Sequence, residues 1–312
     1  MKEFIEEISN LKNIKRRDLI EKDILIQKIL LDLSKDDFFS KNLAFKGGTC
    51  LIKCYLGYYR FSEDIDFTWI DQSLFKDISK KEVRKIISDL KDKIGKLLVK
   101  ASKDGGMDFV LDKNNRRYFE FGGGNKTITF KLWYDSEILK QPSFIKTQIN
   151  FVENIKFNVS KRKIHNLLDN NSDKNLISLY GDDYKNYVDD VLLYTYDIKE
   201  ILCEKVRAIL TRRGIKARDF VDIYLITNNF GIKIQDLKDE IIEKTNFILD
   251  LYEKYQSNFR EKVKLLDSGD LFRWGTEREL LLKDIDEKQF NNFVKELQEF
   301  LREIGKEAIL KY

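Results

Sequence analysis

The chain has 312 residues, of which 42% are hydrophobic and 12% aromatic, and its 57 basic and 53 acidic side chains leave a net charge of +4. This composition indicates a globular protein of one large or two smaller domains and excludes a polybasic nucleic-acid coat, while still permitting a local basic groove. The start MKEFIEEISN has no apolar signal core, and no apolar run reaches membrane-spanning length. We therefore expect a cytoplasmic protein that does not contact membranes.

The cysteine content points the same way. Three cysteines, Cys50, Cys54 and Cys203, are too few for a disulfide framework and favour a reducing compartment. Because the chain has a single histidine, a zinc site built from cysteine and histidine is nearly excluded. We expect the cysteines to be small buried hydrophobic residues.

The first third of the chain changes from helix to strand. Residues 1–45 carry apolar residues at helical spacing and are predicted to be helical. A Gly-Gly-Thr turn at 47–49 leads into a short predicted helix over 50–58, and 64–70 alternates like a strand. Residues 80–101 then predict a long amphipathic helix.

The middle of the chain is rich in predicted strands. Residues 117–135 form two alternating runs around Gly-Gly-Gly-Asn at 122–125, which predicts a hairpin. Pro142 is expected to break the chain, and 143–153 alternates as a further strand. Residues 154–194 look irregular, with the polar segment 169–175 as their clearest loop.

Helical patterns dominate from Asp197 to the end, with predicted helix stops at Gly214 and Gly231. No internal repeat or low-complexity linker interrupts the chain. The order indicates a mixed domain over 1–194 and a helical domain over 195–312.

Two carboxylates beside the glycine turn are the main chemical signal. Asp64 and Asp66 would project from the same face of a strand, about 6–7 Å apart along it. Burying two like charges is costly without a cation, and Mg²⁺ favours such oxygen ligands together with nucleotide phosphates. The main-chain amides of Gly47, Gly48 and Thr49 are suited to holding those phosphates. The alternative is a strand edge with two solvated aspartates beside an ordinary turn.

The order Gly47-Gly48-Thr49, Arg60-x-Ser62-x-Asp64-Ile65-Asp66-Phe67 resembles the DNA-polymerase-β-like nucleotidyltransferases, and specifically their AbiEii/AbiGii toxin branch. The resemblance implies an α+β fold. Its nucleotidyltransferase-like mixed sheet would be flanked by helices and followed by a helical C-terminal domain that completes the active-site cleft. Arg60 and Ser62 would contact the nucleotide. Lys46 could also reach a phosphate, or it could be an ordinary surface lysine.

A second part of the resemblance lies downstream. Glu204-Lys205, followed by Arg218-Asp219-Phe220-x-Asp222-x-Tyr224, is similar to the C-terminal motifs of the same branch. It implies that Lys205 contacts the triphosphate and that Asp219 positions Lys205 or the acceptor. Without the family pattern, Arg218 and Asp222 could equally be a helix-surface pair.

One departure from the family pattern concerns a third acidic residue. Related enzymes carry it on a later strand, where this sequence offers Gln148. Without it, activation of an acceptor hydroxyl by a general base would be weaker. Asp135 or Glu120 of the predicted hairpin are alternatives for this role.

The resemblance therefore implies a nucleotidyltransferase that uses an NTP and Mg²⁺, with Mn²⁺ as an alternative, and an RNA or protein acceptor; tRNA 3′ ends are one candidate. It also implies the toxin of a toxin–antitoxin or phage-defence pair, with a cognate antitoxin as partner. The competing hypothesis is a catalytically degenerate module of the same fold that only binds nucleotide or nucleic acid.

Overall fold

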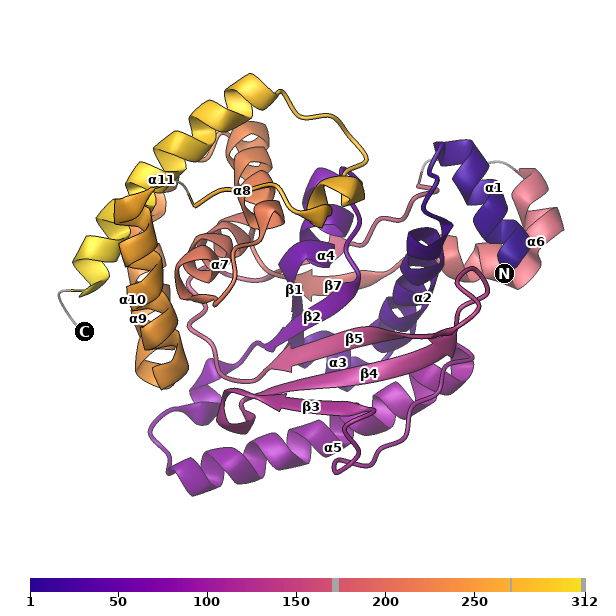
Figure 1. Cartoon of the computed structure of the whole chain (residues 1–312). Helices are drawn as coiled ribbons and strands as arrows, with labels where there is room; N and C mark the ends of the chain where they lie inside the picture. Colours follow the sequence, from indigo (N-terminus) through magenta and orange to yellow (C-terminus); the bar gives the residue numbers. More distant parts are fainter. Residues whose placement is uncertain (170–173, 270, 310–312) are drawn as a thin grey trace. The chain divides into compact units, whose positions relative to one another are not determined.

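A computed structural model describes residues 1–169, 174–269 and 271–309 (Figure 1). The chain divides into two compact units, one formed by 1–153 with 159–196 and the other by 154–158 with 197–312. Compactness does not establish independent folding, so the predicted domain boundary at residue 194 stays a prediction.

The first unit is built on a seven-stranded sheet in the order β3-β4-β5-β2-β1-β7-β6. Strand β2 runs parallel to β5, and β1 runs parallel to β7, whereas the other neighbours are antiparallel. The expected mixed sheet is confirmed. The strands are β1 (Leu43–Lys46), β2 (Asp64–Trp69), β3 (Phe119–Gly122), β4 (Thr127–Asp135), β5 (Pro142–Asn150), β6 (Ser160–Lys163) and β7 (Leu192–Thr195).

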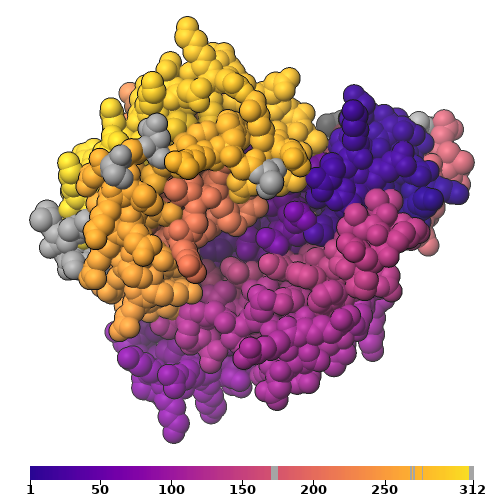
Figure 2. All heavy atoms as spheres, in the orientation of Figure 1, coloured from indigo at the N-terminus to yellow at the C-terminus, as the bar shows by residue number. Residues whose placement is uncertain are grey.

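Helices flank this sheet, as predicted. They are α1 (Lys2–Lys12), α2 (Arg17–Ser34), α3 (Asp37–Asn42), α4 (Gly47–Leu51), α5 (Lys80–Asp104) and α6 (Lys174–Val188). A capping box between Ser79 and Glu82 begins α5, which packs against β4 and α2 and lies beneath β3 and β4 in Figure 1. In Figure 2 the segment from α5 to β5, in magenta, forms a continuous part of the surface of this unit.

Two stretches differ from the expectation, one predicted to be helical and one predicted to be irregular. Residues 43–46 form β1, with all four residues buried, instead of continuing the predicted helices. A short apolar run of this kind cannot be told from a helix by periodicity. Likewise, the segment predicted as irregular contains β6, α6 and β7, although residues 170–173 of its polar loop lie outside the described residues.

Other local predictions are confirmed in type, although some of their bounds differ. A 3₁₀ turn at Gly123–Asn125 joins β3 to β4 as the predicted hairpin. The strand predicted over 143–153 is β5, but it ends at Asn150, and Pro142 is its first residue instead of a break before it, because a proline at the first position of a strand does not interrupt the sheet. The helix predicted over 50–58 begins earlier, at Gly47, and continues as a π-helical turn over Ile52–Leu56.

The second unit is helical. Its helices are α7 (Ile198–Thr211), α8 (Ala217–Phe230), α9 (Lys238–Leu251), α10 (Glu253–Ser268) and α11 (Glu287–Ile309). Gly231 ends α8 in the left-handed conformation with φ +62°, as predicted, whereas α7 ends at Thr211, before Gly214. In the described part of the chain, no helix is both long and apolar enough to cross a membrane.

Candidate active site

The two aspartates of β2 share one face of the sheet, as their spacing predicts. Asp64 and Asp66 are partly exposed, while the alternating residues Ile65 and Phe67 are fully buried on the other face. Phe67 packs edge-on against Phe39 of α3 with ring centroids 4.8 Å apart. The buried face therefore anchors the strand and places both carboxylates together on its other face.

The glycine turn lies directly against these side chains. Gly47 has φ +76°, and a Cβ placed on it would lie 2.5 Å from Oδ2 of Asp66. A Cβ on Gly48 would lie 2.9 Å from Nη2 of Arg60 and 3.1 Å from Oγ of Ser62. The turn thus needs glycine at both positions, because side chains from the predicted motif occupy the space that a Cβ would fill.

Hydroxyl groups tie the turn to β2. The hydroxyls of Thr49 and Ser62 lie 2.9 Å apart, and Thr49 Oγ1 also donates a hydrogen bond to the main-chain oxygen of Asp64. Arg60 is only 2% exposed and donates from Nη1 to the main-chain oxygen of Phe61 at 2.8 Å. The structure therefore brings the first predicted motif together around one turn.

Lys46 lies at the same place but is not a surface lysine. It is 5% exposed, and its Nζ is 3.6 Å from Oε2 of Glu153 and 5.3 Å from the ring centre of Tyr196. In the sheet it is directly paired with Asp66. Its predicted contact with a phosphate stays a prediction, whereas the surface alternative is wrong.

The position expected for a third carboxylate is beside Asp66, on β5. Gln148 is the register partner of Asp66, and Lys146 is that of Asp64. Glu120 lies in the same row but three strands from β2, about 14 Å away by strand spacing, and it pairs with Lys131. Sequence reasoning missed Lys146, because only the register of two strands distant in sequence places it next to Asp64.

The carboxylate pair fits a metal site that a nucleotide completes. In the described residues, no group of three or more His, Cys, Asp or Glu side chains is arranged to hold a metal ion. Magnesium, however, is often held by one or two carboxylates together with substrate phosphates and water. The Gly47 turn packed against Asp66 provides the backbone amides that such phosphates need.

The downstream motif forms a buried ionic cluster in the second unit. Nζ of Lys205 lies 2.9 Å from Oδ1 of Asp219 and 2.5 Å from Oδ2 of Asp222, and Nη1 of Arg212 is 2.7 Å from Oδ2 of Asp219. Asp219 and Asp222 are 2% and 0% exposed. The alternative of a surface pair between Arg218 and Asp222 is therefore wrong, because Asp222 faces Lys205 inside the unit.

Opposing effects act on the pKa of Asp219. Burial raises it, but the charges of Lys205 and Arg212 outweigh burial and hold the pKa of Asp219 below its ordinary value. The cluster therefore keeps Asp219 ionised at neutral pH. Both Asp219 and Asp222 contact the ammonium group of Lys205, while the contact of Lys205 with a triphosphate stays a prediction.

The cysteines contribute no site of their own. Cys50, Cys54 and Cys203 are free and buried, as expected. Burial raises the pKa of the Cys50 thiol well above its ordinary value. The Cys50 thiol therefore remains protonated and behaves as a small hydrophobic residue.

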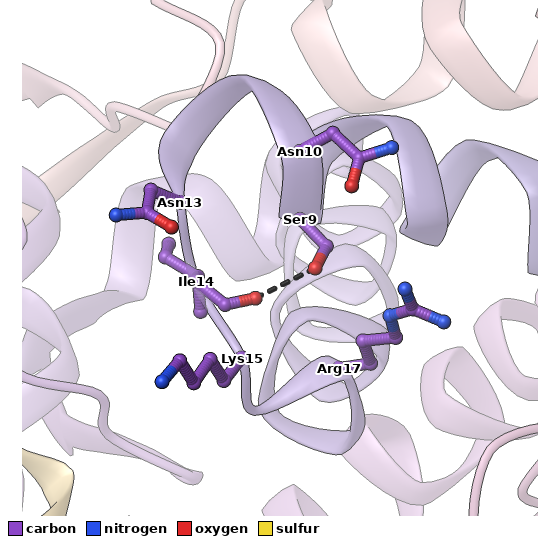
Figure 3. A pocket seen from close by; sticks show the side chains of 6 residues that line it. All are labelled: Ser9, Asn10, Asn13, Ile14, Lys15 and Arg17. Carbon is purple, nitrogen blue, oxygen red and sulfur yellow. Dashed lines mark hydrogen bonds between the residues drawn. The ribbon is translucent and has the colours of Figure 1, made fainter.

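A pocket elsewhere on the first unit contains none of the candidate residues. It is lined by Ser9, Asn10, Asn13, Ile14, Lys15 and Arg17, at the turn between α1 and α2. Figure 3 shows the hydrogen bond from Ser9 Oγ to the main-chain oxygen of Ile14, 2.7 Å long, that closes this turn. The contact explains the turn and suggests no chemistry.

Comparison with known proteins decides the family. A family model described as the nucleotidyl transferase AbiEii toxin of a type IV toxin–antitoxin system matches residues 28–311. The chain belongs to the AbiEii family. The match covers nearly the whole chain, so the AbiEii assignment includes both the β2 motif and the Lys205 cluster. No curated protein matches this AbiEii chain.

Two solved structures from Helicobacter pylori resemble this AbiEii chain. JHP933 is 16% identical over 94% of this chain and 94% of its own, with a TM-score of 0.42. A protein described as a "putative nucleotidyltransferase" is 17% identical over 95% of this chain and 98% of its own, also with a TM-score of 0.42.

Proposed function

We propose that this AbiEii protein transfers a nucleoside monophosphate from an NTP to a hydroxyl group on an RNA or protein acceptor. The acceptor oxygen forms a bond to the α-phosphorus, the bond from that phosphorus to the bridging oxygen of the β-phosphate breaks, and pyrophosphate leaves with the electron pair. The acceptor proton passes to water or to a nearby base. The observation that carries the proposal is the contact between the Gly47 turn and Asp66.

The residues of the turn and their neighbours have distinct roles in the proposed reaction. The amides of Gly47 and Gly48 would bind the triphosphate, and the Ser62 hydroxyl would add a polar contact to it. The Thr49 hydroxyl, which donates to the main-chain oxygen of Asp64, holds the turn against β2. Arg60, buried behind Gly48, holds the turn in place. Lys46 would neutralise charge beside Asp66.

Asp64 and Asp66 would hold Mg²⁺, or Mn²⁺ in its place, and the metal would stabilise negative charge on the phosphates. Lys205 would stabilise the leaving pyrophosphate, with Asp219 holding its ammonium group in position. As a member of a toxin family, the protein would act in the cytoplasm, in a toxin–antitoxin or phage-defence pair, and a cognate antitoxin would limit its activity.

A second function is favoured by one specific observation, the amide of Gln148 beside Asp66. In this alternative the protein binds nucleotide without transferring it, because among the described residues no third carboxylate joins Asp64 and Asp66 to activate the acceptor. The alternative predicts nucleotide binding with no product.

A transfer assay tests the proposal. Purified protein is incubated with Mg²⁺, each α-labelled NTP in turn and total cellular RNA, beside the variants Asp64→Asn and Asp66→Asn. Label entering RNA or protein only with the wild-type chain supports the transferase and identifies nucleotide and acceptor class. Bound NTP with no labelled product in any reaction supports the degenerate module.

A further inference from the structure

An aromatic side chain lies on the carboxylate-bearing face of the sheet. Phe144 of β5 is partly exposed and points to the same face as Gln148 and Lys146, because they alternate along one strand. Trp133 of β4 is its register partner and packs against it with ring centroids 4.7 Å apart. Trp133 thus supports one side of Phe144.

Two lysines flank this ring. Nζ of Lys131 lies 5.7 Å from the ring centre of Phe144, and Nζ of Lys146 lies 5.9 Å from it. Lys131 is paired with Glu120, whereas Lys146 forms no ion pair with any described residue. The surface therefore combines an apolar ring with a cation that has no carboxylate partner.

The position of this surface relates it to the candidate reaction centre. Lys146 is paired with Asp64 on the neighbouring strand, and Phe144 lies two residues before Lys146. Strand spacing and rise place the Phe144 backbone roughly 8 Å from that of Asp64. A chain bound on Phe144 would therefore end within reach of the carboxylate pair.

From this arrangement we infer that Phe144 and Lys146, supported by Trp133 and Lys131, bind the single-stranded end of an RNA acceptor. The inference rests on the proposed function and narrows its acceptor to RNA. A base stacks on the ring of Phe144 while the ammonium group of Lys146 contacts the adjoining phosphate. The end of the strand then presents its hydroxyl near Asp64.

The chemistry favours single-stranded RNA over the other acceptors. Unpaired bases expose their faces for stacking, whereas a duplex hides them. A peptide would gain little from a lysine beside an aromatic ring unless it were acidic and aromatic together. The phosphates of RNA, by contrast, always carry a negative charge that the ammonium group of Lys146 can contact.

Binding of a fluorescent single-stranded oligoribonucleotide, followed by anisotropy without NTP, tests the inference. Phe144→Leu should weaken binding about tenfold through loss of one stacked base, and Phe144→Tyr should retain it. Lys146→Gln should weaken binding and lower the slope of log Kd against log salt by about 0.7, the value for one phosphate contact on a single strand.

A matched control lies on the opposite face of the same sheet. Phe121 of β3 is 44% exposed and has Nζ of Lys91 4.9 Å from its ring centre. Phe121→Leu therefore removes a similar aromatic–cation pair and should leave RNA binding unchanged. Circular dichroism checks that each variant is folded.

The outcomes separate this inference from the proposed function. Unchanged RNA binding by folded Phe144→Leu and Lys146→Gln variants, with transfer still dependent on Asp64, overturns the inference alone. Transfer of label to protein instead of RNA also overturns it. RNA binding that depends on Phe144, with no transfer of any nucleotide, supports the RNA-binding surface but overturns both the transferase and the role of the RNA as its acceptor.

Discussion

Asp66 on β2 and Gln148 on β5 are direct register partners on parallel strands, so a neutral amide stands beside one carboxylate of the candidate metal pair. Replacing Gln148 by glutamate would place three carboxylates on adjacent positions. Without a cation the added charge repels Asp66 and destabilises the fold, whereas bound Mg²⁺ offsets the repulsion.

We therefore expect Gln148→Glu to lower the melting temperature in the absence of divalent ions and to gain more from added Mg²⁺ than the wild type does. Thermal unfolding over a MgCl₂ series measures both effects. Gln141→Glu, at an exposed position before β5, is the control for added charge alone. Equal responses of the two variants to Mg²⁺ would argue against a metal at Asp66.

The carboxylates themselves should control activity without controlling stability. Asp64→Asn and Asp66→Asn are each expected to reduce nucleotide transfer by about 10²-fold or more, since they remove charge that stabilises the transition state. Asp135→Asn, at the exposed far end of β4, should transfer normally. An equal loss of nucleotide transfer in Asp135→Asn would instead assign the role of the third carboxylate to Asp135.

Alanine substitutions in and after the glycine turn distinguish the effect of backbone strain on stability from the effect of site geometry on activity. Alanine at Gly47 or Gly57 must adopt a positive φ, which is a strained conformation that costs about 1–3 kcal/mol. Only at Gly47 does the new Cβ displace the Asp66 carboxylate, because nothing lies within 4 Å of it at Gly57. Gly47→Ala should therefore lose activity, while Gly57→Ala should lose only stability. Transfer rates compared with urea unfolding curves decide this, and loss of activity in both variants would contradict it.

The ionic cluster of the second unit should be costly to break. Lys205→Met removes the cation that contacts both buried carboxylates and leaves Arg212 beside Asp219. We expect this change to lower the free energy of unfolding by about 3–5 kcal/mol at pH 7. Lys264→Met, at an exposed position on α10, should cost little.

The pH dependence of this loss follows from the lowered pKa of Asp219. A carboxylate with a depressed folded-state pKa contributes stability above its unfolded value of about 3.9 and loses it as the pH falls through the folded value. The difference between wild type and Lys205→Met should therefore shrink below about pH 4. Denaturant unfolding at pH 7 and at acid pH measures it. A difference that stays constant would show that the cluster does not act through charge.

Lys91 provides a test on the alkaline side. Its Nζ donates to the main-chain oxygen of Asn125 at 2.8 Å, and burial, with a smaller effect of Lys113, lowers its pKa to about 8. Between that value and the unfolded pKa of about 10.4 the unfolded chain holds more protons, so stability rises with pH by up to about 1.4 kcal/mol per unit. Lys91→Met should remove this rise between pH 8 and 9.5. The same slope in wild type and variant would assign it to other groups.

Local sequence patterns predicted much of the fold, because some backbone conformations accept only a few residue types. The alternation of Asp64 to Phe67 predicted β2 and its two faces, and the glycines of 122–125 predicted the hairpin. Gly231 predicted the end of α8, since glycine adopts the left-handed conformation at little cost. By contrast, the buried β1 and the exposed β6 have four residues each and no alternation to reveal them.

The sequence by itself determined the family, the glycine turn and the carboxylate pair, because these depend on residue types at short spacing. Only the tertiary structure decided that Gln148 lies beside Asp66, that Lys146 lies beside Asp64, and that Lys205 balances Asp222 as well as Asp219. Those relations depend on strand register and helix packing between residues far apart in the chain. Many distant contacts set them together, and no local pattern encodes them.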